Sequence, residues 1–304
     1  MADTLIIAAA SARGYAQAAV TCGYEVIALD AFSDAETKAI SKQAFKLKMD
    51  GFALDKEYFK QVFLEIDLSN IEGFLYGSLF DSCPEVLDWV AKQLSVWGNS
   101  ADVLKQAKDF SFFALLDSLN IPHPKVQTSF PDKLGHWLTK KVGGSGGMHI
   151  RPADLTYGDK TYFQQKITGT PISLLFVADG SKAHLIGFNQ QLLAPTESLP
   201  YRFAGAISNV TLQSNIHKEF EYAAQKLTNT LDLRGICSID AIVGKDNGEG
   251  KNVWLLELNP RLSATFHLYE NLLPLHLQGC AGHLPNNPVK PNISRAQLIL
   301  YAEE

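Results

Sequence analysis

The sequence has few cysteines and no long apolar run, and each shortage removes a class of protein. Its 304 residues include only 4 cysteines, none in a CxxC pair or at a metal-finger spacing, so we expect reduced thiols in a cytoplasmic protein. No stretch approaches the about 20 consecutive apolar residues that a membrane-spanning helix needs. No basic residues precede the first apolar run, so we expect a strand there rather than a signal peptide.

Positive charge is also scarce, which argues against nucleic acid as a partner. The formal net charge is −5, and the Lys and Arg residues do not gather into runs. The hydrophobic share of 46% and the charged share of 19% are ordinary for a soluble enzyme. A chain of this length is expected to fold into about two domains.

The N-terminal residues predict a small α/β domain that lacks the dinucleotide-binding fingerprint. A strand at 4–10, a helix at 11–23 with Ser11 as its cap and a strand at 24–30 form a β-α-β unit, but no GxGxxG follows the first strand. A dehydrogenase is therefore a weaker alternative, in which Asp30 would bind a ribose.

The residues after this unit complete the first domain and begin a second one. A buried strand at 73–78 and a helix at 84–94 complete a first domain at 1–97, and a helical stretch with a Pro-rich stop opens a second at 98–304. Strands predominate from there on, interrupted by one clear helix at 216–231.

The stretch WLLELNPRLSAT at 254–265 begins like a buried strand but places polar side chains on alternate positions. Glu257, Asn259 and Arg261 would share one face, because alternate side chains of a strand point the same way. Pro260 then ends regular pairing. An acid, a neutral oxygen ligand and a base in a row indicate a site rather than a core strand.

The preceding strand supplies a second acid. Residues 235–260 read as a hairpin around an Asn-Gly turn, and symmetric pairing about positions 248 and 249 would place Asp240 opposite Glu257. Opposed carboxylates repel, whereas a divalent cation between them, with Asn259 as a further oxygen ligand, would suit Mg²⁺ or Mn²⁺. The alternative is an edge hairpin with solvated acids, and a one-residue slip in register would also remove the opposition.

A glycine-rich loop between two expected strands, at 138–150, is the candidate partner for such a metal. Glycines let backbone N–H groups approach phosphate oxygens, although a flexible connector has the same composition. The Walker pattern is absent, since no Gly-Lys-Ser/Thr ends the loop. The candidate cradle consists of Gly143, Gly144, Ser145, Gly146 and Gly147, with Lys140 or Lys141 just upstream.

Together these residues resemble the ATP-grasp superfamily of ATP-dependent carboxylate–amine ligases. ELNPR at 257–261 looks like its C-terminal metal and phosphate signature, Asp240 falls at its first acidic ligand, and Lys140 matches the lysine that opens its glycine-rich loop. YFQQKITG at 162–169 resembles its hinge strand. The hinge residues that would edge the adenine are Gln165, Lys166 and Ile167.

The resemblance implies an ATP-grasp fold, of mixed α/β (α+β) class, behind a Rossmann-like pre-ATP-grasp domain. A first lobe at 98–168 would hold the glycine-rich loop, and a second lobe at 169–304 would hold the metal site. Two departures concern nucleotide binding. Phe110 stands where many members have a lysine, for which Lys108 is the candidate replacement, and Gln165 stands where a glutamate is common.

A narrower likeness is to small single-chain ATP-grasp proteins of methanopterin- and methanofuran-linked one-carbon metabolism, which include tyramine–glutamate ligase. ALDAFSDAETK at 28–38 and GSLFDSCPEVL at 77–87 support it. NPRLS at 259–263 also resembles the large subunit of carbamoyl phosphate synthase. The likeness implies a ligase in the biosynthesis of a one-carbon-carrying cofactor.

The family reaction joins a carboxylate to an amine through an acyl phosphate, with ATP and Mg²⁺ (or Mn²⁺) as cofactors. Asp240, Glu257 and Asn259 would hold the metal, Arg261 would meet the transferred phosphoryl group, and Lys140 would neutralise the phosphates. The partners would be two small molecules, without nucleic acid or membrane, and a homodimer stays open. Alternatives are a regulatory ATP-binding protein that lacks catalysis and a kinase that releases a phosphorylated product.

Further residues have two interpretations each. Ser11 and Arg13 follow the first strand, where open α/β sheets bind ligands, although Ser11 is equally a helix cap. Tyr201 and Arg202 lie in a loop-like stretch that would form a substrate wall or a plain surface loop. His267 follows the signature as a catalytic base or as a structural histidine.

Overall fold

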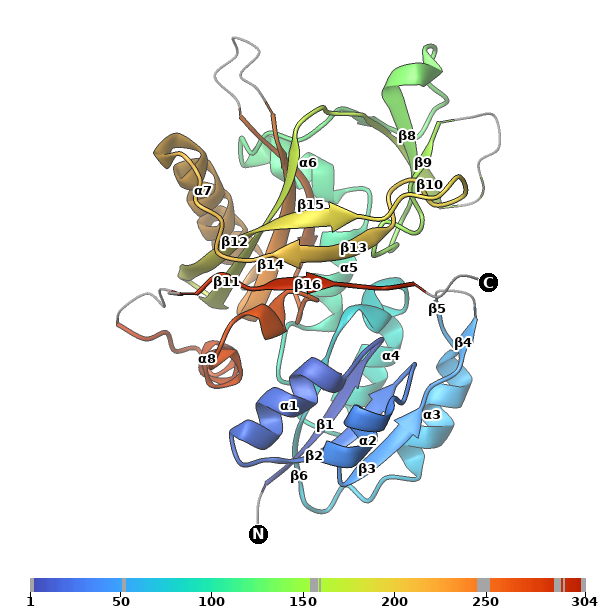
Figure 1. Ribbon diagram of the computed structural model, residues 1–304, viewed down its shortest axis with the longest axis vertical. Coiled ribbons are helices and arrows are strands. Elements are labelled where there is room, and N and C mark those ends of the chain that lie inside the picture. Colours follow the sequence, from blue (N-terminus) through green and yellow to red (C-terminus); the bar gives the residue numbers. More distant parts are fainter. Residues whose placement is uncertain are drawn as a thin grey trace.

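The computed structural model describes residues 3–50, 53–153, 158, 160–244, 252–286, 291 and 293–301. Its N-terminal part is a parallel sheet in the order β3-β2-β1-β6 with helices on both faces (Figure 1). The strands are β1 (Thr4–Ala9), β2 (Glu25–Asp30), β3 (Gln43–Lys46) and β6 (Ile71–Tyr76). The helices are α1 (Arg13–Thr21), α2 (Ala35–Ile40), α3 (Lys56–Leu64) and α4 (Pro84–Ala91).

Burial on both faces explains why the first strand is apolar from Leu5 to Ala9. Leu5 and Ile7 pack in the core that includes α1, whereas Ile6 and Ala8 pack in the core that includes α3 and α4. Successive side chains of a strand point to opposite faces, so a strand that is covered on both sides needs apolar residues at every position.

The start of α1 differs from the expectation. Ser11 is exposed and α1 has no side-chain cap, so the expected Ser11 cap is wrong. The backbone N–H of Ala12 instead donates to the carboxylate of Asp30, which also accepts from the N–H groups of Phe32 and Ser33. Asp30 is fully buried. These local bonds occupy the acid that the dehydrogenase alternative assigned to a ribose, which removes that alternative's remaining support.

The rest of the chain forms two antiparallel sheets, as the strand-rich sequence indicated. Helices α5 (Ala101–Lys108) and α6 (Phe112–Ser118) lead into them. The smaller sheet has the order β7-β10-β8-β9, with β7 (Val126–Gln127), β8 (Trp137–Lys141), β9 (Arg151–Pro152) and β10 (Thr161–Gln165). The larger has the order β15-β14-β11-β12-β13-β16, with β11 (Thr170–Asp179), β12 (Ala183–Leu193), β13 (Phe203–Ile207), β14 (Arg234–Val243), β15 (Val253–Asn259) and β16 (Ala296–Leu298).

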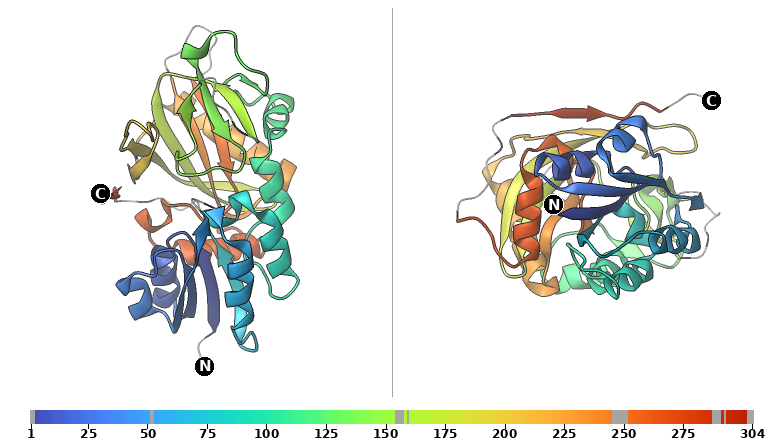
Figure 2. Two further views of the ribbon diagram at one scale, coloured as in Figure 1. Left: turned by 90° about the vertical axis from the view of Figure 1, so that its right-hand side faces the viewer. Right: turned by 90° about the horizontal axis from the view of Figure 1, so that it is seen from below.

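The six-stranded sheet lies between the other two parts of the molecule (Figure 2). Helix α7 (Ser214–Leu231) packs in the core on one of its faces, and α8 (Leu272–Cys280) packs in a core that also contains α1. Short elements complete the described chain: β4 (Met49–Asp50), β5 (Ala53–Leu54), and the 3₁₀ turns η1 (Ser78–Ser82), η2 (Leu134–His136) and η3 (Phe266–Leu268). No helix among the described residues has the length and apolar content to cross a membrane.

The expected mixed α/β class is confirmed. The domain borders at 97/98 and 168/169 stay predictions, although the strands of the first sheet all precede the first border. The stretch LPYRFAGA at 199–206, which contains Tyr201 and Arg202, was expected to be loop-like. Its second half instead enters β13, which pairs with β12.

Candidate active site

The β14–β15 hairpin brings the two acids together as the sequence predicted. Asp240 pairs directly with Glu257, and the same register places Ser238 opposite Asn259. A bulge at Leu256 shifts the pairing by one residue between the acids and the turn, so the predicted register holds from the acids to Ser238 and Asn259 but not toward the turn. The expected Asn247-Gly248 turn lies outside the described residues.

Side-chain hydrogen bonds organise this acidic pair. The Asn259 Nδ2 group donates to Asp240 Oδ2 over 2.9 Å, and Gln191 Nε2, from β12, donates to Asp240 Oδ1 over 2.9 Å. Sequence reasoning missed Gln191, since nothing local marks a glutamine in a long strand as part of a site. The candidate metal ligands therefore lie on neighbouring strands of one sheet and are held by side-chain donors.

Lys108, at the end of α5, supplies the positive charge that the acids need. Its ammonium contacts Glu257 Oε1 and donates to Asn259 Oδ1 over 2.7 Å. Burial opposes ionisation of Glu257, but Lys108 and Lys140 outweigh it and lower its pKa to about 2. Burial and the neighbouring Glu257 raise the pKa of Asp240 to about 6. As the pH falls, Asp240 is therefore the first of the two acids to take up a proton.

The side chains present fit a divalent cation. An ammonium group already lies against a carboxylate and an amide oxygen, which shows that these oxygens favour a cation. In the described part of the chain, no three His, Cys, Asp or Glu side chains form a metal cage. Asp240, Glu257 and Asn259 would therefore need oxygens from a substrate to complete coordination, which is the usual arrangement for Mg²⁺ bound with phosphates.

Arg261 is engaged by a residue of the N-terminal domain that sequence reasoning did not assign. Its Nε and Nη2 groups donate to the two carboxylate oxygens of Asp81, over 3.1 and 2.7 Å. Nη2 also donates to Asn259 Oδ1 over 2.8 Å. Burial alone would lower the pKa of Arg261, but Asp81 raises it. The two-pronged face that was expected to meet the phosphoryl group is therefore occupied by Asp81.

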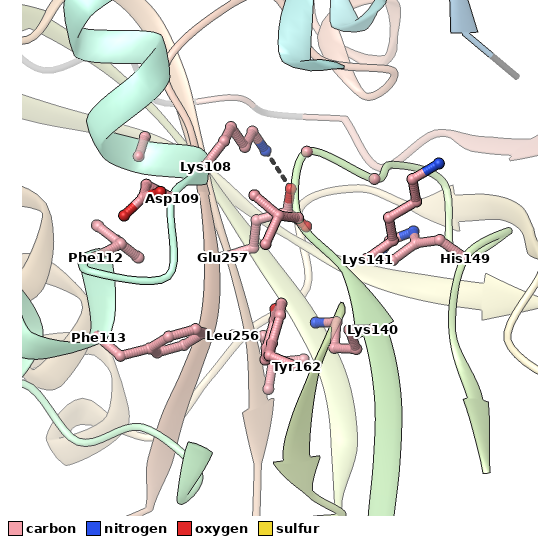
Figure 3. Close-up of a pocket in the computed structure, with 14 residues that line it drawn as sticks. Lys108, Asp109, Phe112, Phe113, Lys140, Lys141, His149, Tyr162, Leu256 and Glu257 are labelled. Atoms are coloured by element: carbon pink, nitrogen blue, oxygen red, sulfur yellow. Dashed lines mark hydrogen bonds and ion pairs between the residues drawn. The ribbon is translucent and has the colours of Figure 1, made fainter. Parts of the chain in front are cut away.

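A pocket opens beside Glu257, between the two antiparallel sheets. Figure 3 shows Lys108 directed at Glu257, with Lys140 and Tyr162 from the smaller sheet on the other side. Lys140 is buried and donates to Gln164 Oε1 over 3.3 Å, and burial lowers its pKa. Lys141, the next residue in the strand, is exposed. Both candidate lysines line the pocket, and Lys140 is the buried one.

The glycine-rich loop borders this pocket and packs against two other parts of the chain. Gly143 and Gly147 have φ angles of +72° and +71°. A Cβ on Gly143 would lie 2.9 Å from the backbone oxygen of Asp81, and one on Gly147 would lie 1.8 Å from that of Tyr201. Glycine is required at both positions by the backbone conformation and by the close approach. The backbone of Tyr201 thus contacts the loop, but Tyr201 does not line the pocket, and its role as a substrate wall stays a prediction.

His149 is a pocket residue that sequence reasoning missed. Its ring lies so close to Gly144 that a Cβ there would come within 2.2 Å of it. Burial and then the charge of Lys140 lower the pKa of His149 to about 4. The imidazole is therefore neutral at pH 7. The signal that could have found it is its position two residues after the glycines at 146–147.

Other candidate residues lie away from this pocket. Gln165, Lys166 and Ile167 do not line it, and Phe112, Phe113 and Tyr162 provide its apolar part instead. His267 packs against Gly14 at the start of α1. Arg13 is exposed, whereas Arg202 is half-buried. Arg13 lies near Asp34 and Glu36, and Arg202 stacks on Tyr301.

Comparisons with solved structures agree with this architecture. The biotin carboxylase domain of 2-oxoglutarate carboxylase from Hydrogenobacter thermophilus, solved with MgADP, ADP and bicarbonate, is similar with a TM-score of 0.73 and 12% identity over 95% of this chain and 72% of that chain. N5-carboxyaminoimidazole ribonucleotide synthetase from Thermus thermophilus is similar with a TM-score of 0.70 and 15% identity over 97% of this chain and 82% of that chain. The enzyme of that name from Thermotoga maritima gives 0.67 and 14% identity over 96% of this chain and 79% of that chain.

Comparisons at the level of sequence identify the family of this chain. No curated protein matches the chain. The model of the ATP-grasp domain family matches residues 106–265, which is more than half of the chain. This match confirms the expected fold, and it agrees with the expected ATP-dependent ligase class and with ATP and Mg²⁺ as cofactors. The chain belongs to the ATP-grasp family.

Proposed function

We propose that this protein is an ATP- and Mg²⁺-dependent ligase that joins a carboxylate to an amine through an acyl phosphate. The observation that supports this most is the opposed pair Asp240 and Glu257, with Asn259 beside it, in an ATP-grasp fold. The glycine-rich loop and Lys140 border the same pocket as Glu257. An acidic pair, a lysine and a phosphate-binding loop are the groups that a bound nucleoside triphosphate requires.

In the first step, a carboxylate oxygen of the acid attacks the γ-phosphorus of ATP, and the bond to the leaving ADP breaks. Bound Mg²⁺ would supply positive charge to the phosphate oxygens, and Asp240, Glu257 and Asn259 would hold it. Lys140 adds a fixed positive charge next to the inner phosphates without a conformational change, because it is already buried there. Arg261 adds a second charge where the phosphoryl group passes.

In the second step, the amine attacks the acyl carbon, the C–N bond forms, and inorganic phosphate leaves with the electrons of the C–O bond. The attacking nitrogen loses a proton in this step. Water competes with the amine for the acyl phosphate, so the site must exclude it. The loop at 143–147, which packs on Asp81 and Tyr201, is the segment positioned to cover the pocket.

A screen of acids and amines with Mg·ATP tests the proposal. Release of ADP and phosphate together with the mass of an amide would support the ligase. A phosphorylated acid without free phosphate would indicate the kinase alternative. Nucleotide binding without turnover across the whole screen would contradict the ligase and favour the regulatory protein.

The finer proposal is that the reaction belongs to the biosynthesis of a one-carbon-carrying cofactor. It is supported by the segments 28–38 and 77–87, which resemble the methanopterin- and methanofuran-linked group. We likewise propose a cytoplasmic location, a homodimer and domain borders at 97/98 and 168/169. Tyramine and glutamate belong in the screen, and amide formation only from unrelated substrates would contradict this finer proposal alone.

A further inference from the structure

The site contains a buried acid from the N-terminal domain that the proposed reaction does not use. Asp81 lies in η1, which follows β6, the strand at one edge of the N-terminal sheet, and it is 3% exposed. The preceding Leu79 and Phe80 are buried in the N-terminal core. The backbone of Asp81 approaches Gly143 of the glycine-rich loop. Its carboxylate is therefore fixed in position before any ligand binds.

Two of the cationic groups beside the acidic pair, Arg261 and Lys108, converge on this carboxylate. Asp81 accepts the two-pronged contact of Arg261, and the Lys108 ammonium lies 3.5 Å from its Oδ2. Because Lys108 also contacts Glu257, the charges alternate across the site. Removal of Asp81 would leave two buried cations near each other without a shared counter-ion, which is costly in a poorly solvated site.

A count of hydrogen bonds shows what remains for a ligand. A guanidinium has five N–H groups. Those of Arg261 donate to the two Asp81 oxygens, to Asn259 Oδ1 and, from Nη1 over 3.2 Å, to the Leu262 carbonyl. The second N–H of Nη1 has no acceptor among the described residues. Arg261 can therefore offer one N–H and its charge without giving up Asp81.

We propose that Asp81 is the positioning residue for Arg261, holding its guanidinium so that the remaining Nη1 N–H faces the phosphoryl group in transfer. This rests on the proposed function, because it assumes that phosphoryl transfer occurs beside Arg261. Asp81 touches neither substrate in this arrangement. It acts through Arg261, and the N-terminal domain thereby becomes part of the active site.

The test uses MgADP alone and MgADP with aluminium fluoride, which mimics a phosphoryl group in transfer, so no acid or amine has to be known. The unmodified protein should bind MgADP and gain affinity when fluoride and aluminium are added. Asp81→Asn should bind MgADP with an affinity within about threefold of that of the unmodified protein. The increase in affinity that aluminium fluoride produces, called the gain below, should be smaller by about tenfold or more. Arg261→Lys should lose the gain similarly. The double variant should lose no more than either single variant, because both changes remove one function.

Asp30→Asn is the matched control, since Asp30 is also buried in the N-terminal domain but bonds to backbone N–H groups. It should lower the melting temperature and keep the gain. If Asp81→Asn does not fold, Asp81→Glu replaces it, and its longer side chain should reduce the gain while charge is kept. A retained gain in the Asp81 variant, or additive losses in the double variant, would overturn the role of Asp81 and leave the proposed function unaffected. No MgADP binding by the unmodified protein would overturn the proposed function and this role with it.

Discussion

At the scale of single residues, Lys108 is the side chain whose role depends most on what else is bound. Its ammonium contacts Glu257 and Asn259, two of the three proposed metal ligands. A metal at these oxygens and an ammonium in the same place exclude each other by charge and by space. We therefore expect Lys108 to compensate the acids in the free protein and to turn toward phosphate oxygens when Mg·ATP binds.

Lys108→Met should lower the free energy of unfolding without metal, by on the order of 2 kcal/mol, because it leaves a buried carboxylate without its partner. Mn²⁺ should then raise the melting temperature of this variant more than that of the unmodified protein. Lys105→Met is the control, since Lys105 lies on the same helix and forms its ion pair with the exposed Asp102. Equal Mn²⁺-induced shifts in melting temperature in all three proteins would show that Lys108 and the metal do not compete for the same oxygens.

Asp240→Asn or Glu257→Gln should abolish ATP turnover while the fold stays near native. Each change removes a proposed metal ligand, and it also removes the repulsion between two opposed carboxylates. Phosphate release and thermal unfolding, measured together, separate the two effects. Full turnover in either variant would rule out the metal assignment. Glu219→Gln, on α7, is a control outside the site, because Glu219 accepts from the backbone N–H groups of Asn252 and Val253.

Arg261→Lys should reduce kcat by roughly 10²-fold or more, and ATP affinity much less. A lysine keeps the charge but cannot grip both oxygens of Asp81 and still face a ligand. Steady-state kinetics with the substrates found in the screen would measure this. Normal turnover combined with weak ATP binding would reassign Arg261 to nucleotide binding and leave Lys140 at the transferred phosphoryl group.

At the scale of elements, the glycine-rich loop links the smaller sheet to the rest of the site. The N–H of Phe203, at the start of β13, donates to the carbonyl of Gly146 over 3.1 Å. Few side chains hold 143–147 otherwise, because four of the five residues are glycine. We expect slower amide exchange in this loop when Mg·ATP is present, and equal exchange in both states would make the loop a simple connector.

Gly147→Ala should weaken Mg·ATP binding and abolish the added protection of the loop. The alanine would have to adopt a φ of +71° and would place its Cβ 1.8 Å from the carbonyl oxygen of Tyr201. Gly135→Ala is the control, because a Cβ there has nothing within 4 Å. Calorimetric titration with Mg·ATP compares the two variants. Equal affinities would show that the loop need not pack on Tyr201.

At the scale of the whole molecule, His276 connects α8 to the large sheet and to the end of the N-terminal domain. Its Nδ1 accepts from the N–H of Ile236, so its Nε2 carries the proton and donates to the carbonyl of Trp97. Both ring nitrogens are used only in the neutral form. Burial lowers the pKa of His276 to about 4, against 6.5 in an unfolded chain.

The protein should therefore lose stability as pH falls from about 6.5 to about 4. Between these values the unfolded chain binds a proton at this position and the folded chain does not, so the contribution of His276 is fully present above pH 6.5. The loss from this residue is at most about 3 kcal/mol. Urea unfolding of the protein and of His276→Gln across this range measures it. Identical pH dependence in both would show that His276 does not titrate on unfolding, since other groups cancel in the comparison.

Features that depend on neighbours along the chain followed from the sequence alone. Alternation placed Glu257 and Asn259 on one face, the hairpin placed Asp240 opposite Glu257, and the run at 143–147 marked a glycine-rich loop. These patterns arise from strand geometry and backbone freedom, which act over a few residues. The same local reasoning located the long strands and α7, since their apolar periods are continuous.

Which distant groups meet in the site depended on the packing of the whole chain. Asp81 is 180 positions from Arg261, and Lys108 is 149 positions from Glu257. No local pattern encodes such a pair, because the contact depends on how η1 and α5 pack against β15. The failed Ser11 cap has the same cause on a smaller scale. The first turn of α1 could be capped by a nearby serine or bond to a carboxylate from the next strand, and the folded sheet supplied Asp30 to the Ala12 N–H.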